Sequence, residues 1–174
     1  MCIRDRLLAS HGNDLTACEH IAEEGELLME QGAIAERILL LMEGTVAVQL
    51  RQGDNEPHTL AIVEAEEILG EMGLFGNGVH SADVRVINGS AKLIAVDGNE
   101  MLQAMLFDAD LTIEILALIC QRCLKSNQIM GLLLDGISAV QAGDQAQLKR
   151  SCQSLREYSH SMALAADHLE SLGS

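Results

Sequence analysis

The sequence predicts an α+β protein, with a mainly β roll of the double-stranded β-helix or jelly-roll type followed by α-helices. Three observations predict this fold. Short stretches with strand-like alternation, separated by turn residues, run from Ala17 to about Val96. From Asn99 onward the apolar period changes from two residues to about 3.6. In the same half of the chain, Leu, Met, Ala and Gln replace Val and Thr, which favours helices.

The strands of the first half are predicted from alternation and turn residues. Residues 45–51 alternate apolar side chains with polar or small ones, as a half-buried strand does. Residues 52–55 read Gln-Gly-Asp-Asn and form the expected turn, and residues 59–63 form the returning strand. Asn88-Gly89 predicts the turn of a further hairpin.

The helices of the second half are predicted from apolar spacing and from terminal residues. A short helix is expected over residues 99–107, and a long one over residues 111–134 with Asp110 as its N-cap. Asp135-Gly136 should end the long helix. A last helix is expected over residues 142–169.

Both long helices carry a stripe with alternating spacings of four and three residues, the pattern of a heptad seam. The first stripe is Leu116, Cys120, Cys123, Asn127, Met130 and Leu134. The second is Leu148, Cys152, Leu155, Ser159, Met162, Ala166 and Leu169. Two interpretations stay open: the stripes pack within one chain, or they form a dimeric coil in which Asn127 sets the register.

Composition and charge narrow the class of protein. The 174 residues include 26 acidic and 11 Lys or Arg side chains, a net charge of −15, which argues against nucleic-acid and anionic-membrane partners. Aromatic residues make up 2%, so stacking sites for bases are not expected. We expect a cytoplasmic, soluble protein because neither a membrane-length apolar stretch nor a secretory leader is visible. Five cysteines then suit a reducing compartment.

The first six residues, Met1 to Arg6, match the translation of a transposon-end adapter from sequencing libraries and are set aside as a scar. The natural first residue then lies elsewhere, and a missing upstream helix or domain is an open alternative. The predicted division of the rest is a roll with short flanking helices over 7–108, a connecting or dimerisation helix over 109–135, and a helical extension over 136–174.

The most informative segment runs from Gly70 to Ala82. Four glycines between Gly70 and Gly78 leave backbone N–H groups uncovered, and residues 71–75 could form one helical turn whose N-terminus faces a ligand anion. In outline this is a phosphate cradle, and Glu71 beside it is suited to accept a hydrogen bond from a sugar hydroxyl. The competing interpretation is a glycine-rich connection between two strands.

Here the sequence resembles a family. Gly-Glu-Met-Gly-Leu-Phe at 70–75, then a short loop, Ser81-Ala82 and an alternating strand resemble the phosphate-binding cassette of cyclic-nucleotide-binding domains. Such domains occur in catabolite activator proteins of the Crp/Fnr type and in protein kinase A regulatory subunits. Gln31-Gly32 and residues 38–48 are similar to the family's entry into the roll. The resemblance implies a non-catalytic ligand sensor that binds cAMP or cGMP and signals through its C-terminal helices.

The resemblance also implies site residues. They are Gly70, Glu71, Met72, Gly73, His80, Ser81, Ala82, Asn127 and Gln128. Glu71 would accept the ribose 2′-hydroxyl, the backbone N–H groups of 70–73 would line the pocket, and Ser81-Ala82 would meet the cyclic phosphate. Asn127-Gln128 lies about where the family's helix contacts the base.

One departure from the family's pattern concerns the phosphate. The family places an Arg before the Ser-Ala pair, whereas this chain has His80. A histidine is mostly neutral above about pH 6.5, and loss of a charge-assisted bond weakens binding roughly 10- to 150-fold. His80 is therefore an ordinary strand-end residue, a weakened or pH-dependent phosphate donor, or a metal ligand. The alternative functions are a degenerate roll that serves as a protein-interaction scaffold and a fragment of a larger regulator.

Other motifs are interpreted as structural. Cys120 and Cys123 have redox-motif spacing but lie on an apolar stripe, and Met72, Met101 and Met105 are expected to fill the core. No catalytic constellation and no metal-binding cluster is recognisable, so we expect no enzyme. Residues 128–174 contain three Lys or Arg and no recognisable helix-turn-helix, which argues against DNA binding in this chain. A homodimer or a protein partner held through the helices is expected instead.

Overall fold

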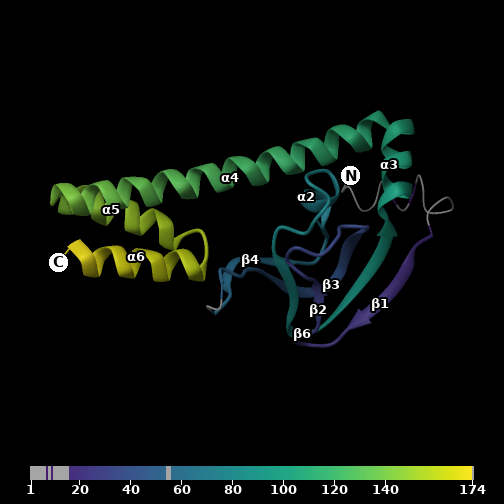
Figure 1. Cartoon of the computed structure of the whole chain (residues 1–174), viewed down its shortest axis with the longest axis horizontal. Helices are drawn as coiled ribbons and strands as arrows, with labels where there is room; N and C mark the ends of the chain where they lie inside the picture. Colours follow the sequence, from purple (N-terminus) through teal and green to yellow (C-terminus); the bar gives the residue numbers. More distant parts are fainter. Residues whose placement is uncertain (1–6, 8, 10–15, 54–55, 174) are drawn as a thin grey trace. The chain divides into compact units, whose positions relative to one another are not determined.

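The computed structural model describes residues 7, 9, 16–53 and 56–173 of the chain (Figure 1). The predicted adapter scar at 1–6 lies outside these residues. The chain divides into two compact units, one up to Ile119 and one from Cys120 onward, and each is described by itself. None of the helices in the described residues has the length and apolarity that a membrane crossing requires.

An antiparallel sheet forms the first unit. Its strands are β1 (Cys18–Ala22), β2 (Leu27–Met29), β3 (Arg37–Leu50), β4 (His58–Glu64), β5 (Glu67–Leu69) and β6 (Asp83–Asp97). The order is β1-β6-β3-β4, with β2 paired to β6 and β5 paired to β3. The single-turn helix α2 (Glu71–Leu74) interrupts the strands, and α3 (Gly98–Phe107) follows them. The predicted roll followed by helices is confirmed.

Alternating residues of β3 serve two cores, because successive side chains of a strand point to opposite faces. Ile38 and Leu40 belong to a cluster that includes helical residues such as Met101. Leu39 and Leu41 belong to a second cluster, formed mainly by strand residues. Both clusters are aliphatic, as the low aromatic content requires.

The predicted hairpin at Asn88-Gly89 is wrong, since β6 continues through both residues. They keep the left-handed conformation expected of a turn, with φ of 58° and 105°. However, β6 pairs with β3 on both sides of them, so the two residues form a bend within one long strand and not the turn of a hairpin. Gly44 of β3 lies at the same bend, where a Cβ would stand 2.7 Å from the Ser90 carbonyl oxygen.

The ends of the long helix also differ from the prediction, whereas the helix over 99–107 and the strand over 59–63 are confirmed. Helix α4 runs from Ala109 to Ala142. Asp108 caps its start, because its carboxylate accepts a hydrogen bond from the Leu111 N–H at 2.9 Å. Gly136 does not end the helix. It is buried, and a Cβ there would lie 2.8 Å from a Leu169 methyl carbon, so the glycine permits close packing.

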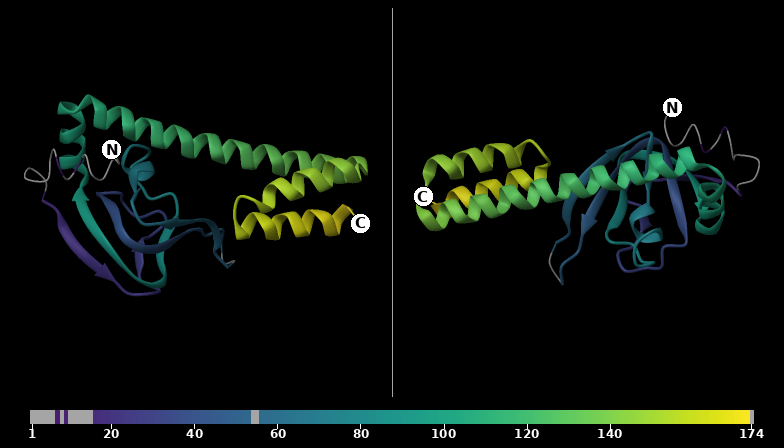
Figure 2. Two further views of the ribbon diagram at one scale, coloured as in Figure 1. Left: turned by 180° about the vertical axis from the view of Figure 1, so that it is seen from behind. Right: turned by 90° about the horizontal axis from the view of Figure 1, so that it is seen from above.

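The second unit contains the end of α4 and a helical hairpin, α5 (Gln145–Arg156) and α6 (His160–Gly173), as Figure 2 shows. The hairpin replaces the single helix predicted over 142–169. Most of the second stripe is buried in the core of this unit, which confirms packing within one chain for that stripe. Arg156 joins the two helices through ion pairs to Asp167 at 2.6 Å and Glu170 at 2.8 Å.

The first stripe is not buried. All six of its residues, from Leu116 to Leu134, are exposed on α4. The expected core packing of Cys120 and Cys123 is therefore wrong, because both thiols are free and exposed. The stripe remains available for a partner.

Candidate functional site

The glycine-rich segment folds into a compact turn at the end of β5. Gly70 has a φ of 92°, and a Cβ there would meet the Met29 Cε at 2.7 Å. A Cβ on Gly73 would meet the Val79 carbonyl oxygen at 2.7 Å. Both positions therefore need glycine, the first for its backbone conformation and both for close approach.

The loop that follows α2 is fastened to the segment before β3. The Ala35 N–H donates to the Gly78 carbonyl at 2.9 Å, and the His80 N–H donates to the Ala33 carbonyl at 2.9 Å. The Gly32 N–H donates to the His80 carbonyl at 2.8 Å. The glycine turn therefore packs through Gly73 against the loop that precedes Ser81.

The site residues predicted within this turn differ in exposure. Glu71, at the first position of α2, is 1% exposed, and Ala82 is also buried. Ser81 is exposed. Met72 is 46% exposed, so its predicted place in the core is wrong, whereas Met101 is fully buried as predicted. A ligand could therefore reach Ser81 directly, and a buried carboxylate lies in the same turn.

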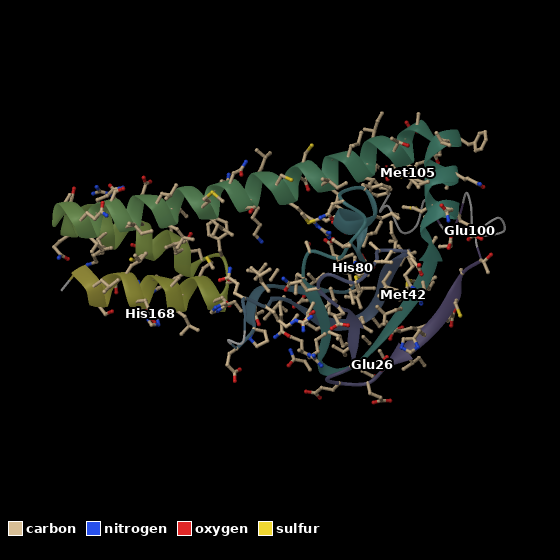
Figure 3. All side chains as sticks on the ribbon, in the orientation of Figure 1. Glu26, Met42, His80, Glu100, Met105 and His168 are labelled. Atoms are coloured by element: carbon tan, nitrogen blue, oxygen red, sulfur yellow. The ribbon has the colours of Figure 1, made fainter. Side chains whose placement is uncertain are left out.

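His80, labelled in Figure 3, is 8% exposed. Burial lowers the pKa of its imidazole below the usual 6.5, and the positive charge of Arg37 lowers this pKa further. The ring is therefore mainly neutral at pH 6.5 and above. Among the described residues no group of three His, Cys, Asp or Glu side chains could hold a metal ion, so His80 has no ligand set around it.

Sequence analysis missed a charged pair at the end of the loop. Asp83 is 3% exposed and accepts hydrogen bonds from the Gln31 N–H at 2.7 Å and from Arg51. The two Arg51 contacts are 2.9 Å from Nε and 3.1 Å from a terminal nitrogen. The available signal was an acidic residue directly after the Ser-Ala pair, at the start of an alternating strand.

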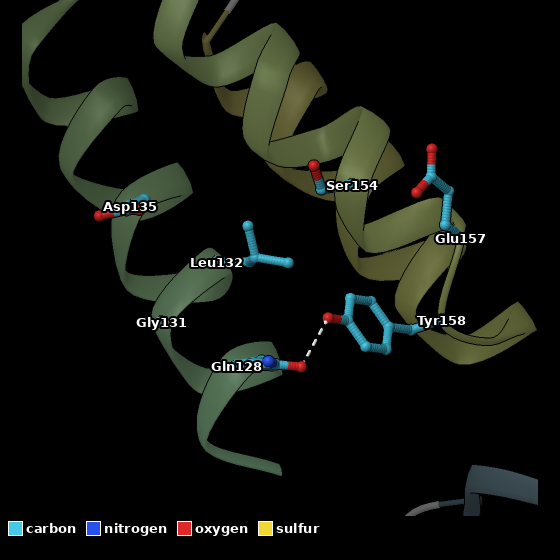
Figure 4. Close-up of a pocket in the computed structure, with 7 residues that line it drawn as sticks. All are labelled: Gln128, Gly131, Leu132, Asp135, Ser154, Glu157 and Tyr158. Carbon is cyan, nitrogen blue, oxygen red and sulfur yellow. Dashed lines mark hydrogen bonds between the residues drawn. The ribbon is translucent and has the colours of Figure 1, made fainter. Parts of the chain in front are cut away.

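The two predicted base-contact residues belong to the second unit. Asn127 is exposed on α4. The Gln128 side-chain oxygen accepts a hydrogen bond from the Tyr158 hydroxyl at 3.2 Å (Figure 4). Both residues of this pair line an open pocket of about 570 Å³ between α4 and the α5–α6 hairpin. Its other lining residues are Gly131, Leu132, Asp135, Ser154 and Glu157.

Residues 19–108 match the protein family described as cyclic nucleotide-binding domain. The chain belongs to this family. The match covers the glycine turn, His80, Ser81 and Ala82 of the cyclic nucleotide-binding domain, and it ends before α4. Comparison with curated protein sequences gives no match.

Solved structures share the fold of this cyclic nucleotide-binding domain. The N-terminal domain of a transcriptional regulator from Streptomyces coelicolor A3(2) is 23% identical, with 74% of this chain and 85% of that chain covered and a TM-score of 0.53. The c-di-GMP responsive global regulator CLP of Xanthomonas campestris is 18% identical, with 79% and 67% covered and a TM-score of 0.63. A cyclic nucleotide-binding domain from Methylobacillus flagellatus KT is 22% identical, with 71% and 68% covered and a TM-score of 0.58.

Proposed function

We propose that the chain is a non-catalytic sensor that binds a cyclic nucleotide, cAMP or cGMP, at the turn formed by residues 70–82. The observation that carries the proposal is the tight glycine turn, fastened through Gly73 and Gly78 to the loop that ends in Ser81. Recognition of a phosphate would use backbone N–H groups of this turn together with the Ser81 hydroxyl. Membership of the family supports the assignment.

Each part of the turn has a proposed task. Glu71 accepts the ribose 2′-hydroxyl, since a buried carboxylate is a strong hydrogen-bond acceptor. Backbone N–H groups of residues 70–73 line the pocket, and Ser81 with Ala82 meets the cyclic phosphate. The assignment of the base contact to Asn127 and Gln128, which belong to the second unit, stays a prediction from the resemblance.

Calorimetric titration of the full chain with cAMP, cGMP and cyclic dinucleotides, at pH 5.5 and pH 8, tests the proposal. We expect saturable binding of at least one cyclic mononucleotide. Glu71→Gln, which keeps the shape of the side chain but removes its charge, should weaken binding of cAMP and leave binding of 2′-deoxy-cAMP unchanged. Absence of binding by every ligand at both pH values would refute the sensor function.

A second candidate function rests on His80. His80 replaces the arginine that the family places beside the phosphate, and its buried, mainly neutral imidazole does not supply the permanent charge of that arginine. A roll that binds no nucleotide would then act as a scaffold for protein partners. A negative titration together with a stable, folded chain would favour this scaffold.

The partner that we propose for the helices is a second copy of this chain. The exposed stripe of α4 consists of uncharged residues, and the neighbouring charges Arg122, Lys125 and Asp135 lie outside it. Two copies with a charge of −15 each would repel, and an uncharged stripe is where they approach at the lowest electrostatic cost. Asn127 within the stripe would set the register of a two-stranded coil.

Light scattering coupled to size-exclusion chromatography tests the dimer. Met130→Glu places a charge in the stripe, where Met130 is 57% exposed, and should convert a dimer into a monomer. The matched control is Gln121→Glu, which adds the same charge to an exposed position of α4 outside the stripe. A wild-type chain that is monomeric at tens of micromolar would refute the dimer.

A further inference from the structure

The first unit contains an arginine that the described part of the chain leaves without a partner. Arg51 pairs with Asp83, and Arg85 donates a hydrogen bond to the Gly25 carbonyl at 2.5 Å. Lys92 forms an ion pair with a glutamate of β1 at 3.7 Å. The backbone of Arg37 pairs with Asp97 of β6, but its side chain forms no hydrogen bond or ion pair with any residue that the structure describes, and it is exposed. Its guanidinium is therefore available to a ligand.

The backbone of Arg37 lies close in space to the glycine turn. Arg37 begins β3, two residues after Ala35, whose N–H is bonded to the Gly78 carbonyl. Its own carbonyl oxygen is 3.1 Å from the point where a Cβ of Gly70 would stand. The backbone around Arg37 therefore contacts both Gly70 and Gly78 of the proposed phosphate turn.

The direction of β3 also favours this placement. Arg37 alternates with Ile38 and so shares a strand face with Leu39, which packs in the same cluster as Met29. Met29 in turn reaches the Gly70 turn, where its Cε would contact a Cβ at 2.7 Å. In addition, the charge of Arg37 is close enough to His80 to lower the pKa of that ring.

We propose that Arg37 supplies the permanent positive charge for the cyclic phosphate, in place of the arginine that the family carries where this chain has His80. The anion would be held from two segments, by the Ser81 loop and by the start of β3. This inference rests on the proposed nucleotide-binding function. The phosphate would give the Arg37 guanidinium a charged partner, which no described residue supplies.

The expected effect is that of a lost charge-assisted hydrogen bond. Arg37→Gln should weaken binding of cAMP about 10- to 150-fold. Binding by the wild-type chain should weaken as salt increases, whereas binding by the variant should depend much less on salt. Adding His80→Arg to Arg37→Gln should restore affinity, because it returns a guanidinium to the phosphate from the other segment.

Calorimetric titration of the full chain with cAMP, at low and at high salt, measures these effects. Arg85→Gln is the matched control: it removes the same charge from an arginine that is engaged with Gly25. Thermal unfolding followed by circular dichroism checks that every variant is folded. If Arg37→Gln does not fold, Arg37→Lys replaces it, with an intermediate affinity and retained salt dependence as the expected result.

The outcomes separate the two proposals. Wild-type binding that Arg37→Gln leaves unchanged would overturn the role of Arg37 and leave the sensor function standing. Equal losses in Arg37→Gln and Arg85→Gln would also overturn it, since the effect would then be one of overall charge. Weakened binding with unaltered salt dependence and no rescue by His80→Arg would assign Arg37 a structural role only. No binding by the wild-type chain would refute the sensor function, and this inference with it.

Discussion

Replacing Asp83 by asparagine should destabilise the first unit although it leaves the side-chain shape unchanged. The carboxylate accepts three hydrogen bonds, one from the Gln31 N–H and two from Arg51. An asparagine side chain has one oxygen and one NH₂ group. In either orientation of the amide, its NH₂ group faces an N–H donor, so at least one contact becomes a clash of two donors.

The magnitude follows from burial. Hydrogen bonds to charged groups contribute about 1.5 to 3 kcal/mol each, and breaking a fully buried ion pair costs about 3 to 5 kcal/mol. The Asp83 side chain is 4% exposed, whereas that of Arg51 is 41% exposed and can be hydrated again when the pair is broken. We therefore expect Asp83→Asn to lower the free energy of unfolding by about 2 to 3 kcal/mol.

Urea unfolding followed by far-ultraviolet circular dichroism measures the change, since the chain has no tryptophan to report by fluorescence. The matched control is Asp97→Asn in the same unit. Asp97 caps α3 by accepting a hydrogen bond from the Asn99 N–H at 2.8 Å, and asparagine caps helices about equally well. A loss for Asp83→Asn of less than about 0.5 kcal/mol, equal to the control, would refute the proposed role of this pair.

Three further predictions concern other parts of the chain. Gly44 has a φ of 97° and lies against the Ser90 carbonyl, so Gly44→Ala should lower the free energy of unfolding in urea by about 2 to 5 kcal/mol. Gly32 has a φ of 86° but lies in open space, so Gly32→Ala should lower it by about 1 to 2 kcal/mol. Equal losses would contradict the close approach at Gly44. Because the folded state lowers the pKa of His80, neutral His80 contributes its full stability above pH 6.5, and the protein loses stability as the pH drops below that value. The melting temperature of His80→Gln should therefore fall less between pH 7.5 and pH 5.5 than that of the wild type. An equal fall would assign the pH dependence to another group. Arg156 lowers the pKa of Glu170, so this ion pair stabilises the second unit fully above pH 4.5 and stabilises it less as the pH falls through the lowered pKa. Arg156→Gln should therefore make the melting temperature, followed by circular dichroism, less dependent on acid pH. An unchanged pH dependence would contradict the role of this pair.

The features that the sequence predicted correctly depend on neighbours along the chain. Strand β4 and helix α3 follow from alternation and from helical spacing, both of which are local signals. The glycine turn was visible for the same reason, because its glycines and the Ser-Ala pair lie within thirteen consecutive residues, 70–82. The family match covers that stretch and the strands around it.

Where the prediction was wrong, a distant segment overruled a local preference. Asn88-Gly89 is a strong turn signal, but pairing with β3 on both sides kept β6 continuous. Gly136 is a typical helix terminator, yet packing against Leu169 placed it inside α4. Cys120 and Cys123 lie on an apolar stripe, and spacing alone does not tell whether such a stripe faces its own chain or solvent.

What the sequence by itself determined is the class of fold, the glycine turn and the missing arginine at His80. Only the tertiary structure decided which charges surround that turn. The pairing of Arg51 with Asp83 joins positions 32 residues apart, and the influence of Arg37 on His80 joins the start of β3 to the loop before β6. Contacts between segments distant in sequence depend on sheet register, and register is set by the summed packing of many side chains.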